Sequence, residues 1–319
     1  MAALCTRSLA RSYRNFTLAA RTAATTSTQR TTRGMAAAAA TSSTAETVPL
    51  PSGARELAMA LADTAAETTK PYFRARNLVR DTKSDASPVT VADRAAEMAM
   101  RKLIEQTFPD HGVFGEEAGY SGAPDASYVW ILDPIDGTKS FITGKPLFVT
   151  LIALTCEGKP CIGVIDQPVI GERWVGASGH PTTCNGEQVR CDDVEVKLSD
   201  AYVFATTPKM FDGSPETRRR FDAMSSACRE VLYGCDGFAY GLVASGHADA
   251  VCEADLGVYD AAALVPVLEG AGGVITDWQG ESLRFDPSIL VNPETSGDKL
   301  TVLATRNGAL HKEALLALE

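Results

Sequence analysis

One stretch, residues 130–141, constrains this chain more than any other, because a predicted strand ends there in two carboxylates. Residues 128–132 form an apolar run whose length predicts a buried strand. Asp133 and Asp136 follow three residues apart, and Gly137-Thr138 comes directly after them. Carboxylate oxygens suit a hard cation such as Mg²⁺, and the amides of a Gly-Thr pair can donate to a phosphate that shares that cation. The alternative is an Asx-type turn that only ends the strand.

Composition agrees with a soluble globular protein and argues against two broad classes. The 319 residues suffice for one large or two smaller domains, and 45% of them are apolar. The formal net charge of −10 argues against a general nucleic-acid binder, and no apolar run is long enough to span a membrane. The eight cysteines form no Cys-x-x-Cys pair, so we expect buried, reduced thiols rather than a zinc site.

Residues 1–45 have the composition of an organelle transit peptide. They are rich in Ala, Thr and Ser, and they contain six arginines, no lysine and no acidic residue. The segment lacks the apolar core of a secretory signal. We therefore predict that residues 1–45 are a transit peptide, and the alternative is a tail that is not removed.

The remainder divides by pattern into two halves, residues 46–195 and 196–319. The first half begins with helical periodicity over residues 52–76, which Pro71 should kink or split. A second helix ending near residue 108 and a set of antiparallel strands follow. The second half alternates strands and helices, which is typical of an α/β arrangement. Its helices are predicted over residues 214–229, 236–245, 259–270 and 307–318.

Five acidic residues fall at predicted strand ends or helix starts: Asp93, Glu116, Asp133, Asp136 and Asp260. Such positions bring carboxylates to the edges of a sheet, where they can meet around a cation. For Asp93 the simplest role is local, because an acid at a helix N-terminus complements the helix dipole.

Three sequence blocks, in this order, resemble the inositol monophosphatase superfamily of Mg²⁺-dependent, lithium-sensitive phosphatases. They are Gly-Glu-Glu at 115–117, Asp-Pro-Ile-Asp-Gly-Thr at 133–138, and Tyr-Asp-Ala-Ala-Ala at 259–263 with Glu-Gly-Ala-Gly-Gly at 269–273. The third block has Tyr-Asp where Trp-Asp is commoner. The resemblance extends from about residue 52 to residue 319, and it implies a layered αβαβα sandwich that usually forms a homodimer.

The same resemblance implies roles for individual residues. The ligands of two or three Mg²⁺ per active site fall on Glu116, Asp133, the backbone carbonyl of Ile135, Asp136 and Asp260. Water activation falls on Thr138, assisted by Asp93. Phosphate and metal-side contacts of the substrate fall on Glu116, Ile135, Gly137, Thr138 and Asp260. Contacts with the organic part of the substrate fall on Gly234, Cys235, Asp236 and Glu253. The first half of the chain thus carries most metal ligands and the second completes the site.

Within the superfamily, residues 133–154, 234–240 and 266–278 are similar to plant-type histidinol-phosphate phosphatases. Inositol-specific members usually have Thr-Asn where this chain has Lys139-Ser140. The similarity implies hydrolysis of histidinol phosphate in histidine biosynthesis. Because that pathway is plastidial in plants, it favours the chloroplast, with the mitochondrion as the alternative. Two other functions stay open: a phosphatase for inositol 1-phosphate or another small sugar or nucleotide phosphate, and a non-catalytic metal-binding relative.

Overall fold

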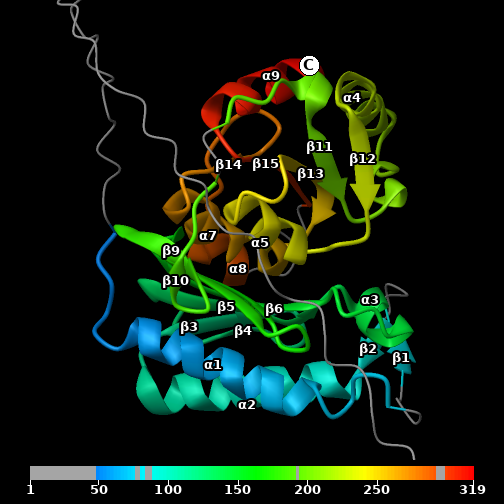
Figure 1. Cartoon of the computed structure of the whole chain (residues 1–319). Coiled ribbons are helices and arrows are strands. Elements are labelled where there is room, and N and C mark those ends of the chain that lie inside the picture. The colour runs from blue at the N-terminus through cyan, green and yellow to red at the C-terminus, as the bar shows by residue number, and fades with distance from the viewer. Residues whose placement is uncertain (1–47, 76–79, 83–87, 192–193, 292–298) are drawn as a thin grey trace, which may run out of the picture. The chain divides into compact units, whose positions relative to one another are not determined.

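The computed structural model describes residues 48–75, 80–82, 88–191, 194–291 and 299–319. The predicted transit peptide lies outside these residues. Residues Glu46–Glu319 form one compact unit. In this unit two β-sheets lie in separate layers, with helices outside each sheet and a third set of helices between them (Figure 1). The arrangement confirms the predicted αβαβα sandwich.

The first outer layer consists of α1 (Ala54–Thr69) and α2 (Val91–Thr107), which contact strands of the first sheet. Apolar residues recur along α1 at spacings of three and four, so that one face is buried. The helix ends at Thr69, and although Lys70 keeps helical backbone angles, Pro71 has no N–H with which to continue the hydrogen-bond ladder. The predicted interruption at Pro71 is confirmed, and the residues described after it, 71–75, do not form α-helix.

The first sheet has the strand order β10-β9-β8-β7-β6-β5-β3-β4. Its pairs are antiparallel except for β3 and β5, which run parallel, so the predicted antiparallel character is confirmed. The strands are β3 (Gly112–Gly115), β4 (Gly119–Ser121), β5 (Tyr128–Asp136), β6 (Val149–Cys156), β7 (Lys159–Gln167), β8 (Glu172–Ala177), β9 (His180–Cys184) and β10 (Glu187–Gln188). The sheet contains the hairpin β7–β8 and a second hairpin, β9–β10, with Asn-Gly in its turn.

The second sheet has the order β12-β11-β13-β15-β14. Strands β11, β12 and β13 are parallel, whereas β15 pairs antiparallel with both β13 and β14. The strands are β11 (Tyr202–Ala205), β12 (Glu230–Tyr233), β13 (Ala250–Leu256), β14 (Val274–Thr276) and β15 (Leu300–Thr305). On its outer side lie α4 (Pro215–Ala227) and α9 (Gly308–Leu318).

The middle layer contains α5 (Phe238–Ala244) and α7 (Leu264–Gly270), and also α6 (Val258–Ala261), which contacts strands of both sheets. The single helix predicted over residues 259–270 is wrong, because two helices form with a break at residues 262–263. Glycines in the first sheet allow α7 to approach closely. A Cβ on Gly163 would lie 2.0 Å from the carbonyl oxygen of Ala263, and one on Gly176 would lie 2.2 Å from that of Pro266.

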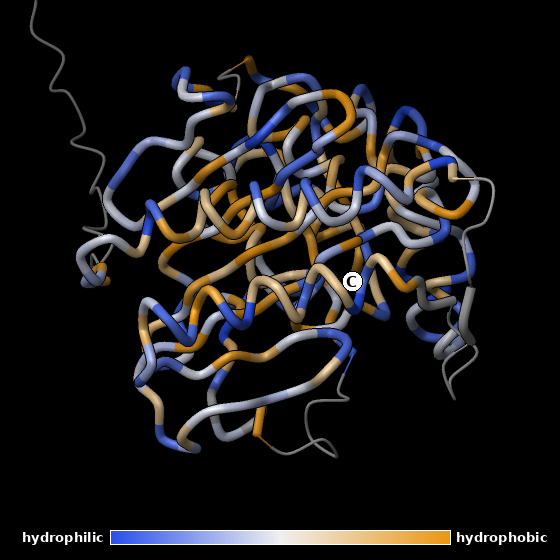
Figure 2. The backbone as a smooth tube through the Cα atoms, turned by 90° about the horizontal axis from the view of Figure 1, so that it is seen from below, coloured by the Kyte–Doolittle hydropathy of each residue, from blue (hydrophilic) through white to orange (hydrophobic). Residues whose placement is uncertain are grey.

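Short elements complete the described chain: β1 (Arg80–Thr82), β2 (Pro88–Thr90), α3 (Thr138–Thr143), α8 (Pro287–Val291) and the 3₁₀ turns Leu198–Asp200 and Pro208–Phe211. Apolar segments run through the interior between the layers, and polar segments follow the periphery (Figure 2). Within the described ranges, no helix has both the length and the apolar character needed to cross a membrane.

Candidate active site

The predicted acidic residues meet where β5 ends. Asp133 and Asp136 lie on β5 itself. Glu116 directly follows β3, whose parallel register places Gly115 beside Leu132. The backbone N–H of Glu116 donates to the carbonyl oxygen of Leu132 at 3.1 Å. Parallel pairing therefore fixes Glu116 next to Asp133, although the two are 17 positions apart in the chain.

Two helices bring further carboxylates to this edge. Asp93 lies in the first turn of α2, and Asp260 lies in α6, where it accepts the N–H of Gly257 at 2.6 Å. Carboxylate oxygens of Asp93, Glu116 and Asp133 lie within 4.8 Å of one another, as do those of Asp133, Asp136 and Asp260. We call these the first and the second carboxylate group.

Asp133 belongs to both carboxylate groups. Asp133 would therefore be available to two neighbouring cations, and a set of oxygen donors without nitrogen or sulfur favours a hard ion.

The electrostatics of the site also fit bound cations. Burial, followed by the charges of neighbouring acids, raises the pKa of Asp133 and of Asp136 well above the usual range. Burial is also the main cause that raises the pKa of Asp260 to about 7. Without a cation, these carboxylates repel one another and hold protons. A divalent ion between them reverses that preference and makes the ionised form the stable one.

The turn after Asp133 is held by three hydrogen bonds. Asp133 Oδ1 accepts the N–H of Ile135 at 3.0 Å, so the Asx-type turn is present within the acidic cluster. Thr138 Oγ1 donates to the carbonyl oxygen of Ile135 at 3.1 Å, and Thr150 on β6 donates to that of Pro134 at 2.8 Å. The Asx-type turn and the pair of acids suited to a cation therefore occur together in one structure and do not exclude each other.

A loop from the second half of the chain, residues 234–237, is hydrogen-bonded to this turn and to the start of α3. Gly237 donates its N–H to Asp136 Oδ2 at 2.5 Å, and Ser140 donates its hydroxyl to Asp236 Oδ2 at 3.1 Å. A Cβ on Gly137 would lie 2.7 Å from Asp236 Oδ2, and the φ of +83° at Gly137 also favours glycine. Asp236 itself has a φ of +46°, in the left-handed region that costs energy for most residues.

The four residues predicted to contact the organic part of the substrate differ in exposure. Gly234, Cys235 and Asp236 are partly exposed and belong to the loop just described. Glu253 on β13 is only 3% exposed. Its two oxygens accept the N–H of Thr206 at 2.7 Å and the hydroxyl of Tyr240 at 2.8 Å. Burial raises the pKa of Glu253 to about 7. Because both of its oxygens already accept hydrogen bonds within the protein, Glu253 affects the site mainly through its charge.

The predicted catalytic pair occupies the same edge. Asp93 is 1% exposed and belongs to the first carboxylate group, while Thr138 lies two positions after Asp136 of the second group. Their roles remain predictions.

Glu97 and Arg101 also belong to this region, although the sequence motifs did not point to them. Together with Asp93 they form an i, i+4, i+8 series on α2, and Glu97 is 1% exposed. A series of polar residues on the buried face of an amphipathic helix was the available signal.

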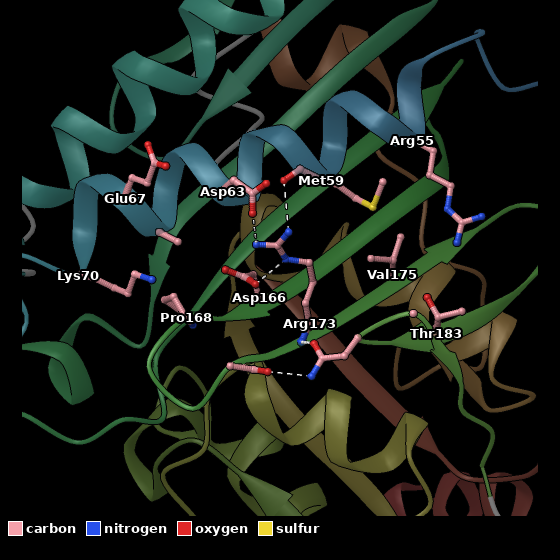
Figure 3. A pocket seen from close by; sticks show the side chains of 14 residues that line it. Arg55, Met59, Asp63, Glu67, Lys70, Asp166, Pro168, Arg173, Val175 and Thr183 are labelled. Carbon is pink, nitrogen blue, oxygen red and sulfur yellow. Dashed lines mark hydrogen bonds and ion pairs between the residues drawn. The ribbon is translucent and has the colours of Figure 1, made fainter.

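A separate cavity of about 700 Å³ lies between α1 and the β7–β8 hairpin (Figure 3). Arg173 extends across it and donates to Asp166 at 2.7 Å and to Asp63 at 2.8 Å, so its charge is balanced locally. None of the predicted site residues lines this cavity. The carboxylate groups at the end of β5 are therefore the candidate active site.

The arrangement of these acids in this fold can be compared with known proteins. A model of the inositol monophosphatase family matches residues 52–318. The chain belongs to this family. Membership makes the protein one of a group of metal-dependent phosphatases and agrees with the acidic cluster at the end of β5.

Three proteins illustrate how similar this family member is to known relatives. The chloroplastic bifunctional phosphatase IMPL2 of Arabidopsis thaliana is 46% identical, over 82% of this chain and 73% of its own length. The histidinol-phosphatase of Chlorobaculum parvum is 35% identical, over 79% of this chain and 96% of its own. The solved structure of an inositol monophosphatase from Zymomonas mobilis has a TM-score of 0.71 and 43% identity, covering 83% of this chain and 96% of that one.

Proposed function

We propose that the protein is a Mg²⁺-dependent phosphatase that hydrolyses histidinol phosphate to histidinol and phosphate. The observation that carries the proposal is the pair of carboxylate groups that share Asp133, with two further acids, Asp236 and Glu253, close to Asp136. Histidinol-phosphatases among the relatives support it.

The proposed Mg²⁺ ligands are Glu116, Asp133, the carbonyl oxygen of Ile135, Asp136 and Asp260, for two or three ions. When bound, Mg²⁺ would lower the pKa of the attacking water and offset charge on the leaving oxygen. The hydroxyl of Thr138, assisted by the carboxylate of Asp93, would take the proton from that water. The N–H groups of Gly137 and Thr138 bind the phosphate. Residues 46–195 thus supply most ligands, and residues 196–319 complete the site.

The choice of substrate rests on charge. Both Asp236 and Glu253 raise the pKa of Asp136 through repulsion, in addition to the effect of burial. Bound Mg²⁺ offsets its own ligands, but these two acids remain close by. A positively charged organic group would relieve the repulsion between these acids. A charge-assisted hydrogen bond from that group to the partly exposed Asp236 would stabilise the bound substrate further. Histidinol offers an amine and an imidazole, whereas inositol is neutral.

A second candidate is hydrolysis of inositol 1-phosphate beside histidinol phosphate. It is favoured by the solved structure from Zymomonas mobilis, which is named as an inositol monophosphatase and is 43% identical.

Initial rates of phosphate release on the two substrates, with Mg²⁺ and with EDTA, test the proposal. We expect kcat/KM to be at least ~100-fold higher for histidinol phosphate, which corresponds to ~2.7 kcal/mol of differential transition-state binding. Asp236→Asn should reduce that ratio and leave a small neutral phosphate ester unaffected. Asp133→Asn controls for contaminating phosphatases. Equal rates on both substrates favour the second candidate, and activity in EDTA contradicts the proposed use of Mg²⁺.

We also propose that the protein acts in the chloroplast as a homodimer, with residues 1–45 as the targeting segment. Two plant relatives are named as chloroplastic phosphatases, and the composition of residues 1–45 supports import. A fluorescent reporter fused to these residues should accumulate in chloroplasts. Accumulation in mitochondria or in the cytosol would contradict the assignment.

A further inference from the structure

We propose that Glu97 is a positioning residue, which fixes the loop carrying Glu116 and thereby sets the affinity of the first carboxylate group for its cation. The inference rests on the proposed metal site. It adds to that site a residue that does not itself belong to either carboxylate group.

Three successive backbone amides fix the loop at Glu116. The N–H of Glu116 donates to the carbonyl oxygen of Leu132 on β5 at 3.1 Å. The next two amides turn the other way: Glu117 donates to Glu97 Oε2 at 2.7 Å, and Ala118 donates to Glu97 Oε1 at 3.0 Å. The loop is thus held to β5 at Glu116 and to α2 at the two residues that follow it.

Arg101 holds the carboxylate of Glu97 in place. Its Nε donates to Glu97 Oε1 at 2.8 Å. Its two terminal nitrogens donate to the hydroxyl of Ser121 at 2.9 Å and to the carbonyl oxygen of Gly119 at 2.5 Å. The guanidinium of Arg101 therefore joins Glu97 to Gly119 and Ser121, the first and last residues of β4. A buried carboxylate with two backbone donors and one guanidinium donor is satisfied, so its position is well defined.

The contact between α2 and this loop is close enough to require glycine. A Cβ on Gly115 would lie 2.3 Å from Cδ of Glu97. Asp93 projects from the same face of α2, one turn before Glu97. Its carboxylate lies within 4.8 Å of those of Glu116 and Asp133. Helix α2 thus holds one acid of the first group directly and positions a second acid through Glu97, so both are set by one rigid element.

The test is Glu97→Gln, with Glu105→Gln as the matched control on the exposed side of the same helix. A glutamine keeps one acceptor oxygen but turns an NH₂ group toward a donor, so at least one loop amide loses its partner. We expect the dissociation constant for Mn²⁺, measured from the free-ion EPR signal of the full chain, to rise ~10–100-fold. Glu105→Gln should bind Mn²⁺ like the wild type. Added metal should restore kcat at saturation to within a few-fold of the wild type.

A double variant separates positioning from a general loss of stability. If Glu97 acts through Glu116, then Glu97→Gln should weaken Mn²⁺ binding no further in a Glu116→Gln background. Additive losses would overturn the inference, as would wild-type affinity in Glu97→Gln. If Glu97→Gln does not fold, Arg101→Lys decides, because lysine cannot make the three contacts of the guanidinium. If Arg101→Lys binds Mn²⁺ as tightly as the wild type, the inference about Glu97 fails and the proposed function stands. If the wild type itself does not bind Mn²⁺, both the inference and the proposed function fail.

Discussion

Asp133 shows how one residue combines structural and chemical roles. It is 1% exposed, it belongs to both carboxylate groups, and it also accepts the N–H of Ile135. An ionised carboxylate so deeply buried is costly unless charges or donors surround it. The hydrogen bond alone is a small compensation, because burial and four neighbouring acids all raise its pKa. A cation is the counterpart that makes its ionised form stable.

The proposed roles of Thr138 and Asp93 predict a kinetic signature. Thr138→Ala and Asp93→Asn should each lower kcat by about 10²-fold or more with little change in KM, because proton transfer matters mainly in the transition state. Steady-state kinetics at saturating Mg²⁺ measure this. If Asp93 only complements the dipole of α2, its variant would keep kcat and lose about 1 kcal/mol of stability.

At the scale of elements, the site depends on contact between the turn after β5 and the loop before α5. Gly237 is the closest point, because its N–H bonds Asp136 and a Cβ there would lie 2.6 Å from Asp136 Oδ2. Its φ of −60° is accessible to any residue, so a substitution causes a steric clash with Asp136 but no backbone strain. We expect Gly237→Ala to displace Asp136 and to lower kcat/KM by at least about 10-fold.

Gly213→Ala is the matched control for that substitution, since a Cβ on Gly213 meets no atom within 4 Å. Its kcat/KM should stay within about two-fold of the wild type. If both variants behave alike in phosphate-release assays, contact between the two loops is not required for activity.

Elements differ in how far the sequence predicts them. The acids at the end of β5 and after β3 could be located, because each follows a local apolar run. The break between α6 and α7 was missed, since the alanines at 261–263 suit a continuous helix. The bonds from the loop amides to Glu97 and the bonds to Glu253 join residues at least 13 positions apart, which no local pattern encodes, whereas the Glu97–Arg101 pair lies within one helix.

For the molecule as a whole, the clustered acids link stability to pH and to metal. A carboxyl group whose pKa is raised on folding binds more protons in the folded state than in the unfolded state. For Asp260 the difference in bound protons spans the pH range from its ordinary pKa of 3.8 to its raised pKa of about 7. Stability contributed by the protonated group is present below the lower value and is lost as pH rises through the upper one. Asp133 and Asp136 shift in the same direction.

We therefore predict that the metal-free protein is less stable near pH 8 than near pH 5.5, by at least about 1 kcal/mol. Urea unfolding in EDTA at the two pH values measures the difference. Mg²⁺ should stabilise the protein far more at pH 8, because it binds ionised ligands of the folded state only. Asp260→Asn should reduce the pH dependence, and the exposed Asp255→Asn should not. Metal-free stability that rises between the two pH values would show that repulsion among these acids does not govern the folded state.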